Sequence, residues 1–106
     1  MKKCTFKIVT VDFNADGHPT ITKEHTGYEV DILGLRCFVD KRRSRCWVIT
    51  EAMSGFSIAG GDTRKDAIQE AKARMENVGP GGVATGLIKS ARSVWNHGLE
   101  WPVNAD

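Results

Sequence analysis

The three histidines are the first residues of this chain that could bind a metal or transfer a proton. His18 lies beside a predicted turn, His25 at a strand end and His97 at a helix end. Their spacing matches no metal-ligand motif, because zinc and related ions are held by several ligands at short, regular intervals. We therefore predict a surface position for each histidine, and we expect neither a metal nor another cofactor.

The chain also has three cysteines: Cys4, Cys37 and Cys46. An odd count without a Cys-x-x-Cys spacing does not fit a disulfide framework or a structural zinc site. Three reduced thiols are instead typical of a cytosolic protein. Nucleophilic catalysis needs a base held beside the nucleophile, and Ser54 does not lie in a Gly-x-Ser-x-Gly motif. The sequence therefore predicts a protein that is not an enzyme.

Four basic residues lie within a stretch of five: Lys41, Arg42, Arg43 and Arg45. We call them the basic tip, because the strand-like runs on either side predict a hairpin. Arg36 precedes them on the same predicted strand. Guanidinium groups bind carboxylates and phosphates bidentately, so the basic tip predicts contact with an acidic protein surface or with nucleic acid. The alternative is a solvated turn, and a net charge of +2 does not indicate nucleic-acid binding by itself.

A second candidate for partner binding is Trp101, which lies next to Pro102 in a predicted extended tail. Tryptophan is enriched at protein interfaces. For Trp47 and Trp95 we expect core packing instead. Trp101 predicts either an anchor for a protein partner or a contact in a homodimer.

Alternation of apolar and polar residues predicts the elements that hold these side chains. We expect strands at 4–13, 20–26, 28–32, 35–40, 45–50 and 56–59, with Gly27 separating the second from the third. Gly34 predicts a bulge or bend, and Ser54-Gly55 a turn. If the hairpin loop has four residues, Phe38 lies opposite Trp47.

Two helices are predicted after the strands. Thr63 is a good N-cap, and Asp66 three residues later completes a capping box. Gly79 and Pro80 end this first helix, because glycine suits the left-handed C-terminal position and proline cannot continue a helix. A second helix is expected from about residue 83 to 97.

The length of 106 residues fits one domain, β-rich over 4–60, helical over 63–98 and extended over 99–106. The order of elements predicts an α+β fold: an antiparallel sheet of about five strands, followed by two helices packed on one face. Without a signal-peptide pattern or an apolar run of about 20 residues, we expect a soluble cytoplasmic protein that does not contact a membrane.

The strand-to-helix junction resembles the HicB antitoxin domain, in which a Gly-Asp-Thr sequence and an acid–alanine pair open a helix. The matching residues here are Gly61, Asp62, Thr63, Asp66, Ala67 and Ala71. The resemblance covers about residues 47–71, although the family's proline before Gly55 is absent and no DNA-binding module follows the helix. It implies a small inhibitory binding protein rather than a catalyst. Small domains without catalytic groups also resemble phage-encoded inhibitors of bacterial defence, including anti-CRISPR proteins.

The sequence thus predicts a non-catalytic inhibitor that binds another protein or complex. Its partner would present an acidic or nucleic-acid-binding surface to the basic tip. The alternative is a small nucleic-acid-binding module that uses the same hairpin.

Overall fold

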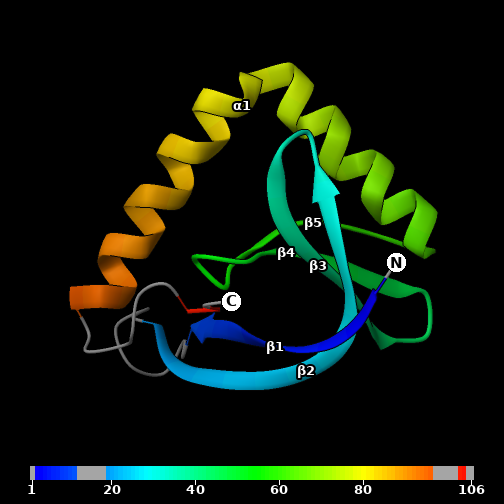
Figure 1. Ribbon diagram of the computed structural model, residues 1–106, viewed down its shortest axis with the longest axis horizontal. Coiled ribbons are helices and arrows are strands. Elements are labelled where there is room, and N and C mark those ends of the chain that lie inside the picture. Colours follow the sequence, from blue (N-terminus) through cyan, green and yellow to red (C-terminus); the bar gives the residue numbers. More distant parts are fainter. Residues whose placement is uncertain (1, 12–18, 97–102, 105–106) are drawn as a thin grey trace.

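The computed structural model describes residues 2–11, 19–96 and 103–104, which form one sheet followed by a helix. The five strands of the sheet are antiparallel, and each is hydrogen-bonded to the next one along the chain. They are β1 (Lys2–Val11), β2 (Pro19–Ile32), β3 (Leu35–Arg43), β4 (Cys46–Glu51) and β5 (Ser57–Gly61). The helix α1 (Arg64–Asn96) follows β5, and Figure 1 shows its first half lying along the sheet.

β2 is one long, curved strand, so the predicted break at Gly27 is wrong. Its first part pairs with β1 and its last residues pair with β3. A Cβ at Gly27 would overlap the carbonyl oxygen of Val39 and would lie 2.8 Å from Cβ of Asp40. The absence of a side chain at Gly27 therefore allows β2 to lie this close to β3, at the point where β2 begins to pair with β3.

β3 is buried on both faces, because α1 covers one face and β1 covers the other. Adjacent side chains of a strand point to opposite faces. On one side, Val39 belongs to a cluster with Ala71 of α1. On the other side, the Phe38 ring stacks on the ring of Phe6 in β1, with centroids 4.5 Å apart. The sheet thus curls so that the β1–β2 ribbon lies across β3.

The two hairpins at the ends of β3 have two-residue turns. Leu33 and Gly34 have φ of +52° and +88°, as a type I′ turn requires, so Gly34 belongs to a turn rather than to a bulge. Ser44 and Arg45 connect β3 to β4. The predicted pairing of Phe38 with Trp47 is wrong, because the loop is shorter than four residues: Phe38 pairs with Thr50, and Trp47 pairs with Lys41.

The β4–β5 connection contains the turn predicted at Ser54-Gly55. Gly55 has φ of +72°, a conformation in which glycine carries no steric cost. The carboxylate of Glu51 accepts hydrogen bonds from the backbone N–H of Met53 (3.0 Å) and Ser54 (2.6 Å). Glu51 is only 3% exposed, and these two donors stabilise its buried charge.

The prediction of two helices packed on one sheet face is wrong. The described residues contain one helix, α1, with a kink at Gly79 (φ +78°, ψ +152°). Proline fits the first turn of a helix, where no N–H is needed, so Pro80 continues the chain after the kink without a loop. Figure 1 shows the segment beyond the kink bending away from the sheet. The fold is therefore mostly β with one helix.

The predicted N-cap at Thr63 is confirmed: its hydroxyl accepts a hydrogen bond from the backbone N–H of Asp66 at 3.1 Å. Ala67, Ala71 and Met75 bury one face of the helix against the sheet. Across the described residues, no helix is long and apolar enough to cross a membrane.

The C-terminal residues Val103 and Asn104 are fixed against β1. The amide nitrogen of the Asn104 side chain donates to the carbonyl oxygens of Lys7 (2.8 Å) and Ala52 (2.9 Å), and its amide oxygen accepts from the backbone N–H of Lys7. One carboxamide thus satisfies both backbone groups of Lys7 at the edge of the sheet.

Candidate functional site

The basic tip divides into one residue that is bound within the protein and three that are exposed. Arg42 donates from Nε to Oδ2 of Asp40 (2.7 Å) and from its terminal nitrogen to the hydroxyl of Thr50 (3.2 Å). The other three side chains are exposed, and we call them the tip cations: Lys41, Arg43 and Arg45. None of them forms an ion pair with another described residue.

Asp40 holds Arg42 in place. Its side chain is 2% exposed, and Oδ2 lies 2.7 Å from Nε of Arg42 and 2.9 Å from Nδ1 of His25. The other oxygen, Oδ1, has no hydrogen-bond partner among the described residues. A buried carboxylate is costly unless it is paired, so Arg42 acts as a structural counter-ion rather than as a free group at the hairpin end.

His25 does not have the free surface position that the sequence predicted. It is part-buried on β2 and bonded to Asp40, fifteen residues away along the chain. A histidine–carboxylate pair orients a general base in hydrolases, but such a base also needs a nucleophile. Within the described residues no serine, threonine or cysteine side chain is hydrogen-bonded to His25. The pair therefore links β2 to β3 without completing a triad.

Arg36 lies apart from the tip cations. It stands seven residues before Arg43, which is roughly 20 Å along an extended strand. Its Nε donates to Glu29 (2.5 Å), a terminal nitrogen donates to the carbonyl oxygen of Asn104 (3.2 Å), and its guanidinium lies 5.1 Å from the centroid of the Phe38 ring. The structure thus does not bring Arg36 together with the rest of the predicted site. It lines a shallow depression with Glu29, Val30 and Asp31 instead.

Two aromatic side chains lie close to the tip cations. Trp47 is the cross-strand partner of Lys41, and Tyr28 pairs with Val39, two residues before Lys41. Both rings are only half-buried, and both pack against the main core cluster. Strand alternation alone did not indicate this proximity, since it depends on the register of three strands.

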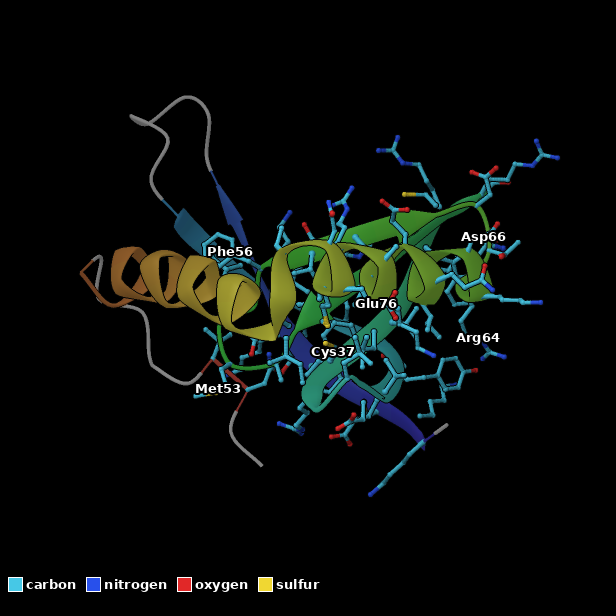
Figure 2. The ribbon with its side chains drawn as sticks, turned by 90° about the horizontal axis from the view of Figure 1, so that it is seen from above. Cys37, Met53, Phe56, Arg64, Asp66 and Glu76 are labelled. Carbon is cyan, nitrogen blue, oxygen red and sulfur yellow. The ribbon has the colours of Figure 1, made fainter. Side chains whose placement is uncertain are left out.

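The start of α1 borders the same region. Gly61 pairs with Trp47, and a Cβ at Gly61 would lie 2.9 Å from Cβ of Asp66. The guanidinium of Arg64 lies 5.2 Å from the centroid of the Tyr28 ring. Figure 2 shows Asp66 beside the end of the β3–β4 hairpin, from which nitrogen-tipped side chains project at the upper right.

Cys37 and Cys4 do not have the lowered pKa of an activated thiol. Burial, followed by the negative charges of Glu51 and Asp31, raises the pKa of Cys37 to about 12. Burial, followed by the charge of Glu29, also raises the pKa of Cys4. All three thiols are free. Cys37 and Cys4 are therefore protonated at neutral pH, the opposite of what a nucleophile requires.

Several predicted residues cannot be placed. His18, His97 and Trp101 lie outside the described residues. In the part of the chain that is described, no group of three or more histidine, cysteine or acidic side chains is arranged to hold a metal ion.

Comparison of the chain with protein-family models, with curated proteins and with solved structures gives no significant match.

Proposed function

We propose that this protein is a non-catalytic inhibitor that binds another protein or complex in the cytoplasm, as antitoxins and phage anti-defence proteins do. The observation that carries this proposal is the set of tip cations: three exposed basic side chains, without ion-pair partners among the described residues, at one hairpin end. The resemblance of residues 47–71 to the HicB antitoxin domain supports the same kind of function.

The hairpin that carries these charges is fixed within the fold. Arg42 ties the end of β3 to Asp40 and Thr50, and Lys41 pairs with Trp47 on β4. A group held in place before binding loses less conformational freedom on association, and this raises affinity. A partner would therefore meet three charges on a preorganised support, whereas a hairpin serving solubility alone does not need that order.

Reversal of the tip charges tests the proposal. We expect Lys41→Glu/Arg43→Glu/Arg45→Glu to abolish affinity capture of a host protein, because each substitution replaces an attraction by a repulsion. The matched control is Lys2→Glu/Lys3→Glu/Lys7→Glu, which makes the same charge change at exposed lysines of β1. In Figure 2 the start of β1 lies at the lower right, and the β3–β4 turn lies at the upper right.

Capture should be followed by an activity measurement on the captured protein, because the proposal is inhibition and not binding alone. Addition of the wild-type chain should lower that activity, and the tip variant should not. Equal capture by the tip variant and the control would contradict a role for the tip cations.

The second candidate is a nucleic-acid-binding module, favoured by the half-buried aromatics Trp47 and Tyr28 beside Lys41. Positive charge combined with aromatic side chains is typical of surfaces that bind single strands. An electrophoretic shift with single- and double-stranded DNA and RNA at low and near-physiological salt distinguishes the two. A salt-sensitive shift that is lost in the tip variant would favour this candidate.

A further inference from the structure

The number of free cations at the hairpin end is small. Arg42 is bound to Asp40, and Arg36 lies at the other end of β3, so only the three tip cations remain of the residues predicted on β3 and β4. Each phosphate neutralised on a single strand contributes about −0.7 to the slope of log affinity against log salt. Three contacts give a slope of only about −2, which is much shallower than the slope of a protein that makes roughly 6–10 phosphate contacts.

The basic surface does not continue onto the start of α1, where the exposed carboxylates of Asp62 and Asp66 alternate with the exposed cations of Arg64 and Lys65. Asp66 lies next to Gly61 of β5. Gly61 is the cross-strand partner of Trp47, and Trp47 is the cross-strand partner of Lys41. Two strand spacings separate Lys41 from Gly61, so Asp66 lies roughly 10 Å from the backbone of Lys41. Asp62, next to Gly61, is exposed as well. A long polyanion that crossed the tip toward α1 would meet these carboxylates.

The nearby aromatic rings are not free stacking platforms. The guanidinium of Arg64 already lies over the Tyr28 ring at 5.2 Å. Trp47 packs against the core cluster that contains Ile49 and Ala59. A base needs an open ring face, whereas a protein partner can use the half-buried edges of tyrosine and tryptophan beside arginine, which is the composition typical of interface hot spots.

We infer that the partner presents a short cluster of carboxylates on a polypeptide to the tip cations. This inference rests on the proposed function and specifies its partner. Arg43 and Arg45 would bind carboxylates bidentately, and Lys41 would contribute a point charge beside Trp47. Asp62 and Asp66 would limit the length of an acidic segment that can bind favourably.

The inference can be tested with three labelled probes: a twelve-residue peptide with three adjacent glutamates among glycines and serines, a peptide with nine glutamates, and a twelve-nucleotide single-stranded DNA. Chemical-shift changes in isotope-labelled wild-type protein at low salt would report affinity and location. We expect the three-glutamate peptide to shift the resonances of Lys41, Arg43, Arg45 and Trp47. The nine-glutamate peptide should bind more tightly than the three-glutamate peptide only by a small statistical factor, because it offers the tip cations more equivalent sets of three adjacent glutamates.

The variants used for capture also serve here. The tip variant should weaken binding of the three-glutamate peptide by at least about tenfold, since several partly exposed ion pairs are lost and replaced by repulsion. The β1 control, compared with the tip variant at near-physiological salt so that charges outside the contact are screened, should change it by less than about twofold.

Two results would overturn the inference, and they differ in what they imply for the proposed function. If the oligonucleotide bound more tightly than the three-glutamate peptide and its binding depended on the tip cations, the partner would be a nucleic acid. This result would favour the second candidate function. If no probe bound while protein capture still depended on the tip, the partner surface would not be acidic and the inhibitor proposal would stand. If no probe bound and protein capture did not depend on the tip cations either, the inhibitor proposal would be contradicted as well.

Discussion

At the scale of single residues, the most informative group is the carboxylate of Asp40. It is 2% exposed and shares one oxygen between Arg42 and His25. Neighbouring arginines of one basic sequence therefore have different roles, because the side chain of Arg42 reaches a buried charge and the side chain of Arg43 does not. A charge run in a sequence gives the number of cations but not how many of them a partner can use.

This difference predicts unequal effects of two alanine substitutions. Arg42→Ala should lower the free energy of unfolding by about 3 kcal/mol, because it leaves a buried carboxylate with only His25 as a partner. Arg43→Ala should change it by less than about 0.5 kcal/mol, as is usual for an exposed side chain. Chemical denaturation of both variants measures the values. Equal midpoints would contradict the counter-ion role of Arg42.

The thiol of Cys37 predicts a pH dependence of stability. Its pKa rises from 9.0 to about 12 on folding, so the unfolded chain releases this proton first as the pH increases. The free energy of unfolding should therefore be unaffected by this group below pH 9. Between pH 9 and about 12 it should fall by up to about 1.4 kcal/mol per pH unit.

Cys37→Ala should lack this contribution. Denaturation of both proteins from pH 8 to 10.5 under reducing conditions should show the stability difference narrowing as the pH rises. Parallel curves would mean that the thiol titrates at the same pH in the folded and the unfolded chain.

At the scale of elements, the path of β2 organises the fold. It pairs first with β1 and then with β3, and Gly27 lies where the two pairings meet. The backbone of Val39 occupies the space that a side chain at Gly27 would need. The same passage places His25 against Asp40, so the curvature of one strand decides which charges are buried.

Gly27→Ala should consequently destabilise the protein by about 3 kcal/mol or prevent folding, because the added methyl group meets backbone atoms that cannot rotate away. Gly86→Ala is the control: among the described residues, no atom beyond its chain neighbours and the nearby backbone of the helix lies within 4 Å of a Cβ built there, and alanine favours the helix by up to about 1 kcal/mol. Thermal unfolding of both variants tests this. A Gly27→Ala protein as stable as the wild type would contradict the close approach of β2 and β3.

At the scale of the whole molecule, the two faces of β3 are covered by parts of the chain that lie on either side of it in sequence. α1 covers one face, and the β1–β2 ribbon covers the other. Val103 and Asn104 are hydrogen-bonded to β1 and to the β4–β5 connection. The β3–β4 hairpin end remains uncovered by these described elements, which is why its cations are exposed (Figure 2).

Local signals were sufficient for several features. The cap at Thr63, the turn at Gly55 and a hairpin between β3 and β4 each depend on residues that are adjacent or three apart, so the sequence determined them. Strand alternation likewise indicated the β-rich first half, because burial on a pleated sheet has a period of two residues.

Only the tertiary structure decided which basic side chains are exposed to a partner and which are bound within the protein. His25 and Asp40 are fifteen residues apart, and Arg36 and Asn104 are sixty-eight apart, so no local pattern could reveal either contact. The continuity of β2 through Gly27 depends on how closely β3 approaches it, and the single kinked helix depends on the conformation of Gly79. The sequence by itself determined where the basic hairpin lies. The curl of the sheet decided that Arg42 serves the fold and that Lys41, Arg43 and Arg45 remain exposed, because burial of a carboxylate is set by strands that meet only in the folded protein.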